Sequence, residues 1–387
     1  MKNIVTKSLL AVGLAAGMAG TALAQQGVSD TEIVIGSNGD LSGVFAPFNV
    51  QSIKAMQQTF DEVNAAGGIH GRKIKFIVED HGYQVPKAVQ NFNKLINSDK
   101  VFAMVQNLGT PHNLAGFPMM EAAKVANISP LTAARQMIEG DITYKYTGTS
   151  SYYDQLKAGV EFLAKQNGAK EICAMYFPSD FGLEVHEGAK EQAEAMGLTY
   201  AAETTHKPDD QDFVGSLTKL KEAGCDIIAT AVGVRQTIVI LGTAKKLGWT
   251  DVAFIGSSAG FNTAVAKVPG GVTEGYYAAA GWSDLENRIA TNEELRKWAE
   301  GFKATFGEDP GTAAQLGRSA AMTLVKGLEA AGKDLTPESF QKGMETLAYF
   351  DPIGDTDIKY GPGDHQGGDV IVISKIEGGV WKEVGRQ

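Results

Sequence analysis

The sequence contains few of the residues from which metal and redox sites are built. Its 387 residues include only two cysteines, Cys173 and Cys225, and six widely separated histidines. No CxxC pair and no spacing typical of zinc ligands occurs, so we expect neither a metal site nor a bound cofactor. Both cysteines begin apolar, strand-like runs. We favour two buried free thiols over a disulfide between them, although an oxidising compartment would permit the bond.

Basic residues are also scarce relative to acidic ones. The chain has 35 Lys and Arg against 45 Asp and Glu, a formal net charge of −10. An acidic surface disfavours binding to nucleic acid and to anionic lipid, so we expect neither partner. Hydrophobic residues make up 43% of the chain, which is typical of a globular, core-forming protein. The length favours two α/β units, and no low-complexity tract or long linker separates them.

Only one long apolar run is present, at residues 9–20. Two lysines precede it, and the small-x-small sequence Ala22-Leu23-Ala24 follows it. This pattern predicts a cleavable signal peptide over residues 1–24, with Gln25 as the first residue of the mature chain. The run is short for a membrane span. No cysteine lies at the predicted cleavage point, so we expect export without a lipid anchor.

Beyond residue 24, short apolar runs alternate with amphipathic stretches, and this β-α order predicts a parallel sheet covered by helices on both faces. A first series predicts strands at residues 33–35, 74–78, 101–105 and 128–131, with helices at 52–63, 88–96 and 114–125. A second series predicts helices at residues 153–165, 184–196, 213–222 and 237–247, with strands at 171–176, 198–205, 226–231 and 252–255. The tail predicts helices at residues 292–306, 312–331 and from 336, then strands at 357–360, 370–376 and 380–384.

The most specific segment is Asp61-Glu62-Val63-Asn64-Ala65-Ala66-Gly67-Gly68-Ile69-His70-Gly71-Arg72-Lys73-Ile74. A helix ends there, paired glycines supply its left-handed cap, and a strand begins. Together with Leu41-Ser42-Gly43, Ser129-Pro130 and Phe181-Gly182, this string resembles the periplasmic binding proteins of ABC importers of the branched-chain amino-acid type. The resemblance covers essentially the whole mature chain.

The resemblance implies a type I periplasmic-binding fold, in which two Rossmann-like α/β lobes trap a ligand by hinge closure. It places three crossovers near residues 144–148, 276–281 and 347–355. The N-terminal lobe is then formed by residues 25–146 and 278–348, and the C-terminal lobe by residues 147–277 and 349–387. The resemblance further implies a periplasmic monomer that captures a small carboxylate, such as a branched-chain amino acid or a related acid, and delivers it to a membrane permease.

Candidate ligand-binding residues follow from the strand ends, because open α/β sheets bind ligands at the carboxyl ends of their strands. Thr110 follows the strand at 101–105 and begins a helix, so its hydroxyl and the free helix amides suit a carboxylate. The alternative is that Thr110 only caps that helix. By resemblance, Phe48 and Phe181 take the places of ligand-covering tyrosines, and the full set is Phe48, Gly109, Thr110, Leu131, Thr132, Ala133, Phe181, Arg235 and Ser258.

Ser258 is a departure from the family pattern. It stands in Gly256-Ser257-Ser258-Ala259-Gly260, where branched-chain amino-acid binders have a carboxylate that pairs with the ligand's ammonium. A hydroxyl cannot neutralise a buried ammonium. Arg235 would add positive charge if it reached the cleft, although a solvated surface position is the slightly favoured alternative. Both residues favour a simple aliphatic or aromatic carboxylate over an α-amino acid.

Two other functions remain open. The segment 256–260 has the G-x-S-x-G pattern of an esterase nucleophile, and His365 follows it in the chain order of a hydrolase triad. The helix predicted after it is short, and no oxyanion motif accompanies it, so we expect no catalytic residues. A ligand sensor for a signalling receptor would use the same fold as an importer's binding protein.

Overall fold

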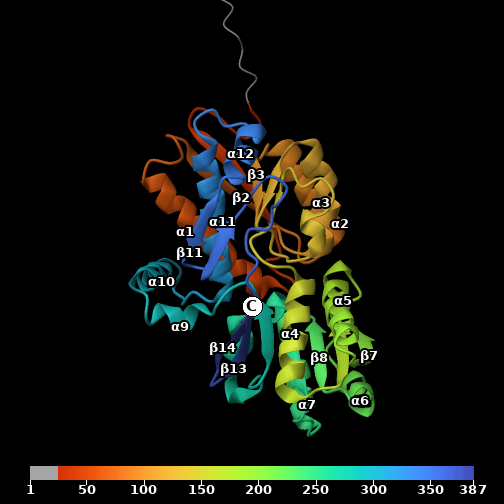
Figure 1. Ribbon diagram of the computed structural model, residues 1–387. Helices are drawn as coiled ribbons and strands as arrows, with labels where there is room; N and C mark the ends of the chain where they lie inside the picture. The colour runs from red at the N-terminus through yellow and green to blue at the C-terminus, as the bar shows by residue number, and fades with distance from the viewer. Residues whose placement is uncertain (1–24) are drawn as a thin grey trace, which may run out of the picture.

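Figure 1 shows two lobes, one above the other, each built around one sheet. The computed structural model describes residues 25–387, so the predicted signal peptide lies outside the described residues. The sheet of the first lobe is parallel throughout, in the order β2-β1-β3-β4-β5. Its strands are β1 (Glu32–Gly39), β2 (Lys73–Asp80), β3 (Ala103–Val105), β4 (Ala126–Ile128) and β5 (Lys145–Tyr146).

The second sheet has seven strands in the order β14-β13-β10-β9-β8-β6-β7. It is parallel from β10 to β7, and β13 and β14 add an antiparallel hairpin at one edge. The strands are β6 (Glu171–Tyr176), β7 (Thr199–Thr205), β8 (Ile227–Ala231), β9 (Ala253–Gly256), β10 (Tyr277–Ala280), β13 (Val372–Glu377) and β14 (Val380–Arg386). The predicted fold, two Rossmann-like lobes joined by three crossovers, is confirmed.

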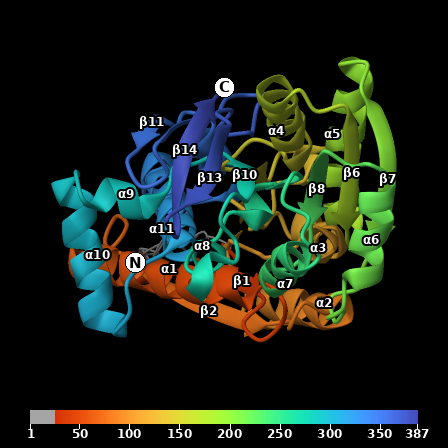
Figure 2. The same cartoon turned by 90° about the horizontal axis from the view of Figure 1, so that it is seen from below.

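Helices cover both sheets. In the view from below, α4 and α7 lie on opposite sides of the strands of the second sheet (Figure 2). The first lobe contains α1 (Ala46–Ala65), α2 (Val85–Asn93), α3 (Thr110–Ala122), α11 (Thr312–Ala331), α12 (Pro337–Met344) and the turns η1 (Lys94–Ser98) and η2 (Arg135–Ile138). The second contains α4 (Tyr152–Asn167), α5 (Asp180–Ala195), α6 (Val214–Glu222), α7 (Val234–Lys246), α8 (Thr263–Ala266), η3 (Ser258–Gly260) and η4 (Pro269–Gly271). Beside the junction lie α9 (Leu285–Ile289) and α10 (Glu293–Phe306). Between residues 25 and 387, no helix is long and apolar enough to cross a bilayer.

Helix α11 packs along α1, which ties a late segment of the chain to the first lobe. Phe60 of α1 and Leu324 of α11 belong to one buried cluster with residues of β1 and β3. Gly317 permits the close approach, because a Cβ at this position would overlap the backbone of Ser52. The first lobe therefore has its own core, formed by segments far apart in the sequence.

The motif at residues 61–74 connects α1 to β2. Gly67 and Gly68 have positive φ angles of 110° and 74° after the end of α1, as the paired glycines predict. Asn64 holds the two elements together: its side-chain oxygen accepts from the backbone N–H of Ile74 at 2.7 Å, and its amide donates to the Ile74 carbonyl at 2.8 Å. These paired bonds give a physical reason for the asparagine as well as the glycines.

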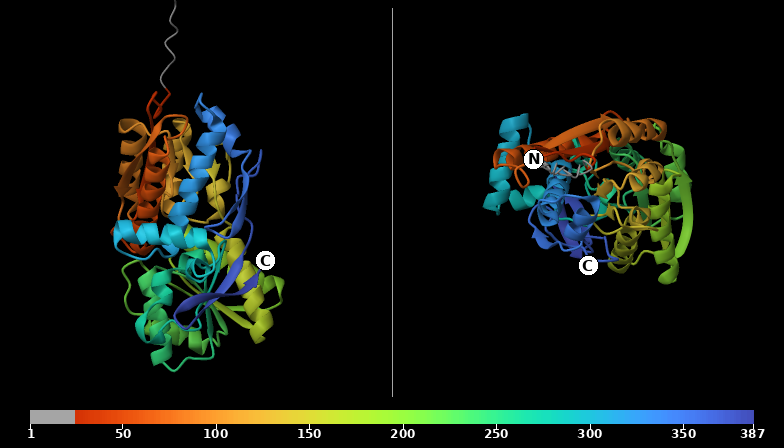
Figure 3. Two further views of the ribbon diagram at one scale, coloured as in Figure 1. Left: turned by 90° about the vertical axis from the view of Figure 1, so that its left-hand side faces the viewer. Right: turned by 90° about the horizontal axis from the view of Figure 1, so that it is seen from above.

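The chain passes between the lobes after β5, after β10 and after the hairpin of β11 (Ala348–Asp351) and β12 (Thr356–Lys359). The side view in Figure 3 shows the blue C-terminal segment running from the upper into the lower lobe. The boundary predicted at residue 278 falls inside β10, which pairs in the second sheet as far as Ala280. The boundary predicted at residue 349 falls inside β11, yet Ile358 and Tyr360 still pack in the core of the first lobe. The family resemblance places crossovers near residues 276–281 and 347–355, so the sequence predicts no strand at either position.

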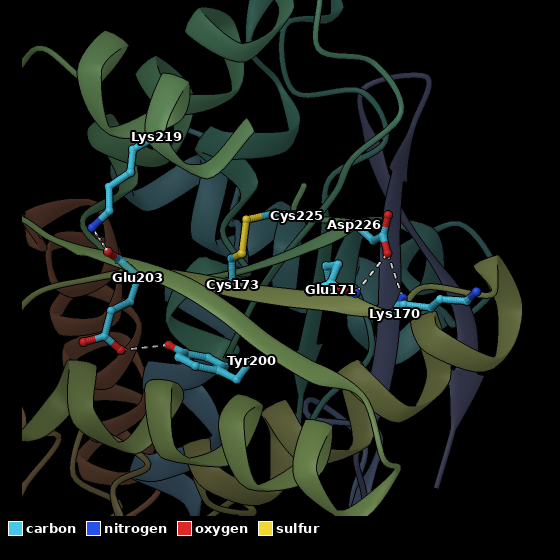
Figure 4. The surroundings of a disulfide bond; sticks show 8 residues. All are labelled: Lys170, Glu171, Cys173, Tyr200, Glu203, Lys219, Cys225 and Asp226. Carbon is cyan, nitrogen blue, oxygen red and sulfur yellow. Dashed lines mark hydrogen bonds between the residues drawn. A yellow bond between two sulfur atoms is a disulfide. The ribbon is translucent and has the colours of Figure 1, made fainter. Parts of the chain in front are cut away.

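The two cysteines form a disulfide, so the expectation of free thiols is wrong (Figure 4). Cys173 lies in β6, and Cys225 lies two residues before β8, which pairs directly with β6. Their Cα atoms are 5.8 Å apart, within the usual range for a disulfide. Figure 4 also shows Asp226, whose carboxylate accepts from the backbone N–H groups of Lys170 and Glu171 beside the bond.

Candidate functional site

A cavity lies between the two lobes, and both supply its walls. The first lobe contributes the start of α1, the start of α3, the segment after β4 and one side of α11. The second contributes the start of α4, the start of α5 and η3. Eight of the nine predicted site residues line this cavity, namely Phe48, Gly109, Thr110, Leu131, Thr132, Ala133, Phe181 and Ser258. Their role in ligand binding stays a prediction.

The start of α3 forms the most polar part of the wall. Gly109 is the N-cap residue, with a φ of 95° that favours glycine, and a Cβ there would overlap the ring of His112. Thr110 is the first helical residue and is buried, and its hydroxyl shares a hydrogen bond of 2.7 Å with the hydroxyl of Thr132. The Thr110 side chain therefore does not cap the helix. Two hydroxyls lie beside the first turn of α3, where backbone N–H groups lack partners within the helix.

Aromatic rings form much of the remaining wall. Phe45 at the start of α1 meets Phe181 of α5 edge to face, with ring centroids 5.8 Å apart, so this contact joins the two lobes. Tyr152 packs on Phe181 at 5.2 Å. Burial raises the pKa of Tyr152 to about 12, so its phenol is neutral near pH 7. The aromatic lining residues are Phe45, Phe48, Tyr83, Tyr152, Phe181 and Trp282.

Two buried histidines support this wall from behind. The rings of His81 and His112 stack with centroids 4.3 Å apart, and His112 also contacts Tyr83. Burial lowers the pKa of His81 to about 3 and that of His112 to about 4, and the neighbouring imidazole lowers the former further. Both rings are neutral near pH 7 and add no charge to the cavity.

Within the described part of the chain, no Asp, Glu, Lys, Arg or His side chain lines the cavity. Its polar side chains are hydroxyls, amides and one indole N–H. Asp40, behind the start of α1, is buried and accepts from the backbone N–H of Phe45 at 2.8 Å, but it does not line the cavity. An uncharged lining beside a helix N-terminus can compensate an anion, whereas it offers nothing to a cation.

Arg235 is the ninth predicted residue, and the structure places it elsewhere. It is exposed on the first turn of α7 and donates to the side chain of Gln211 at 3.4 Å. It does not line the cavity. Arg235 follows the end of β8, as the strand-end rule requires, but no residue of the segment 232–235 lines the cavity and the Arg235 side chain is exposed.

Ser258 lines the cavity but lacks the surroundings of an esterase nucleophile. It begins η3, and the next helix, α8, has only four residues. Its backbone N–H donates to the side chain of Gln155 at 2.8 Å. His365 is buried against Tyr146, with ring centroids 4.1 Å apart, and its Nδ1 lies 2.7 Å from the carbonyl oxygen of Ile142. His365, Tyr146 and Ile142 do not line the cavity.

Several lining residues were absent from the sequence prediction. Tyr83 follows β2 and Trp282 follows β10, so the strand-end rule could have found both. Trp282 was missed because residues 276–281 were interpreted as a crossover rather than as a strand. Gln315 and Ser319 lie one turn apart on α11, and their polarity on the buried side of that helix was the available signal.

A family model described as periplasmic binding protein matches residues 32–379. The chain belongs to this family. A leucine-, isoleucine-, valine-, threonine- and alanine-binding protein from Pseudomonas aeruginosa is 23% identical over 88% of this chain and 89% of its own length. A fatty acid ABC transporter substrate-binding protein from Thermomonospora curvata is 27% identical, covers 93% of both chains and superposes with a TM-score of 0.83. A solute-binding protein from R. palustris in complex with benzoate is 18% identical over 91% of this chain and 95% of its own, with a TM-score of 0.80.

These findings confirm the predicted role. The chain is a periplasmic binding protein that serves as the substrate-binding component of an ABC importer and binds a small molecule. Its family and these relatives are binding proteins rather than enzymes.

Proposed function

We propose that this periplasmic binding protein delivers a small carboxylate that has an apolar aliphatic or aromatic body and no ammonium group. The observation that carries the proposal is the uncharged lining of the cavity, taken over residues 25–387. A buried ammonium without a carboxylate partner is strongly unfavourable. A carboxylate, by contrast, can accept from the hydroxyls of Thr110 and Thr132 and from the N-terminus of α3.

The names of two relatives support a carboxylate without an ammonium, and the name of a third represents the alternative. One of the three is named for fatty acids and another holds benzoate, and both ligands are carboxylates without an ammonium. The Pseudomonas aeruginosa relative is named for branched-chain and other small amino acids, which are the alternative ligand class. Ser258 favours the first group: it lines the cavity, and by the family resemblance it takes the place of a carboxylate that pairs with the ligand's ammonium.

The working form follows from the same proposal. Signal peptidase removes residues 1–24, and the mature chain acts as a monomer that presents its closed lobes to a membrane permease. We expect no ester hydrolysis, because Ser258 lines the cavity whereas His365 does not and has its Nδ1 against the Ile142 carbonyl oxygen. A sensor role would use the same cavity. Genes for a permease and an ATPase next to the gene of this chain would favour transport over sensing, and their absence would favour sensing.

Pairs of ligands that differ only in the ammonium test the proposal. Mature chain, freed of bound ligand by unfolding and refolding with its disulfide intact, is titrated calorimetrically with 4-methylpentanoate and leucine, and with 3-phenylpropanoate and phenylalanine. We expect at least one acid to bind ten times more tightly than its amino acid. At a hundred times its Kd, that acid adds about 2.7 kcal/mol to the free energy of unfolding. Binding by the amino acids alone would refute the proposed ligand class.

Ser258→Glu is the matched variant for the same titrations. It places a carboxylate in the cavity, so preference should move toward leucine or phenylalanine. Ser258→Ala controls for loss of the hydroxyl and should leave the preference for acids in place. Short p-nitrophenyl esters are added to the wild type and to Ser258→Ala, and turnover that disappears in the variant would show an esterase.

A further inference from the structure

A second polar region of the cavity lining is formed by Trp282 and Gln315. Trp282 follows β10, and Gln315 lies in the second turn of α11. The amide nitrogen of Gln315 donates to the carbonyl oxygen of Ser283 at 3.0 Å, so the glutamine is held beside the residue next to Trp282. Thr110 and Thr132 come from other elements, α3 and the segment after β4. The cavity thus has two polar regions that are built from different elements.

Two polar atoms of this second region are buried without partners. Trp282 is 6% exposed and Gln315 is 0% exposed. Over residues 25–387, neither the indole N–H of Trp282 nor the side-chain oxygen of Gln315 has a hydrogen-bond partner. The bond to Ser283 fixes the amide orientation, because a carbonyl oxygen must face the nitrogen. One free donor and one free acceptor therefore lie among the lining residues, and leaving both unpaired is costly.

Ser319 extends the acceptor side of this region. It lies one turn after Gln315 on α11 and lines the cavity. Its hydroxyl donates to the buried carboxylate of Asp351, so its oxygen faces any ligand only as an acceptor. No charged side chain lines this region within the described residues. The matching ligand group is neutral, accepts one hydrogen bond and donates another.

We propose that the transported acid carries a hydroxyl group on its body, away from the carboxylate, and that Trp282 and Gln315 bind this hydroxyl. The inference rests on the proposed function, since it takes the carboxylate at Thr110 and Thr132 as the other fixed point. A hydroxyl accepts from the indole N–H and donates to the glutamine oxygen, which satisfies both buried atoms at once. An ammonium would satisfy only the acceptor, and a second carboxylate only the donor.

The test uses acids that differ only in a terminal hydroxyl. The pairs are 4-hydroxybenzoate and benzoate, 3-(4-hydroxyphenyl)propanoate and 3-phenylpropanoate, and 6-hydroxyhexanoate and hexanoate. In calorimetry with the wild type, we expect the hydroxyl member of at least one pair to bind ten times more tightly or better. A site built to bind a hydroxyl rejects the analogue without it, because its buried polar groups stay unpaired.

Trp282→Phe removes the donor and keeps an aromatic ring. The indole N–H has no partner in the protein, so this change breaks no hydrogen bond of the fold, and its cost to apo stability is limited to the packing lost by the smaller ring against Phe261. We expect the ratio of the two affinities within each pair to fall from tenfold to near one, because the smaller ring affects both members of a pair alike and the lost N–H affects only the hydroxyl member. Trp298→Phe is the matched control: its indole N–H is also buried and unpartnered, but it packs in α10 away from the cavity. This control should keep the full preference.

The outcomes separate the two proposals. Equal binding of both members of every pair, or a preference that persists in Trp282→Phe, overturns the hydroxyl site and leaves the carboxylate proposal standing. Binding of leucine, isoleucine or valine with no binding of any acid overturns the proposed ligand class, and the hydroxyl site with it. A preference lost equally in Trp298→Phe also overturns the inference, because the effect would then be general to tryptophan loss.

Discussion

At the scale of single residues, the hydroxyl of Thr110 is the best-defined polar group of the cavity. It is buried, bonded to Thr132, and placed at the N-terminus of a helix of 13 residues. Removing a hydrogen bond to a charged oxygen costs more than removing one between neutral groups. Threonine and valine have nearly the same shape, so the substitution changes chemistry more than packing.

We expect Thr110→Val to weaken binding of the best acid by about 1.5–3 kcal/mol. The free energy of unfolding without ligand should fall by less, because the Thr110 hydroxyl caps no helix. Calorimetry gives the affinity and urea unfolding gives the stability. Serine at the same position keeps the hydroxyl and serves as the control. A variant with unchanged affinity and a large loss of apo stability would assign Thr110 a purely structural role.

At the scale of secondary-structure elements, the disulfide links β6 to the approach to β8. The two cysteines are 52 residues apart in the sequence, and the loop they close contains α5, β7 and α6. A covalent link across such a loop restricts the unfolded chain and thereby stabilises the native one.

We expect the double variant Cys173→Ala/Cys225→Ala to lose about 2–4 kcal/mol of unfolding free energy. Neither cysteine lines the cavity, so ligand affinity should stay within about twofold of the wild type. Urea unfolding with and without a reductant makes the comparison, and the reductant should affect only the wild type. Equal stability of the two proteins under oxidising conditions would contradict the prediction.

The strands and helices also show which parts of the fold and of the site could be predicted from the sequence. The alternation of strands and helices predicted a parallel α/β fold, because burial imposes its period on long segments. The hydrophobic period does not determine the order of strands in a sheet. The disulfide was therefore not predicted, because it depends on the pairing of β6 with β8. The strand-end rule located Thr110, Thr132 and Ser258 in the cavity. It missed Trp282 because residues 276–281 were interpreted as a crossover, so no strand end was expected where β10 ends.

At the scale of the whole molecule, an ion pair joins the lobes. Arg135 of η2 in the first lobe donates to Glu184 of α5 in the second, with Nε 2.9 Å from Oε1, and also to Glu187 at 2.7 Å. Glu184 is 2% exposed, and its burial raises the pKa of its carboxyl group. If the lobes parted, this carboxylate would regain water, so its pairing with Arg135 favours the closed arrangement.

We expect Arg135→Ala to weaken binding of every ligand by about 1–3 kcal/mol, because closure would then bury Glu184 without a partner. Arg135→Ala/Glu184→Gln removes the uncompensated charge and should recover most of the affinity. Calorimetry measures both variants, and small-angle X-ray scattering of the apo proteins reports the share of open molecules. Unchanged affinity in Arg135→Ala, or no recovery in the double variant, would rule out this role for the pair.

The burial of the cavity between the two lobes also affects the rate at which a ligand dissociates. Phe45 and Phe181 meet across the cleft and are both buried, so a bound molecule departs after the lobes separate. The dissociation rate of any ligand then cannot exceed the rate of opening, however weak its own contacts are. Loss of the Arg135–Glu184 pair should raise this maximum dissociation rate by the same factor for all ligands. Substitutions at Thr110 should change the dissociation rate only of ligands that bind Thr110. The residence time of a ligand therefore depends partly on an ion pair between the lobes that does not line the cavity.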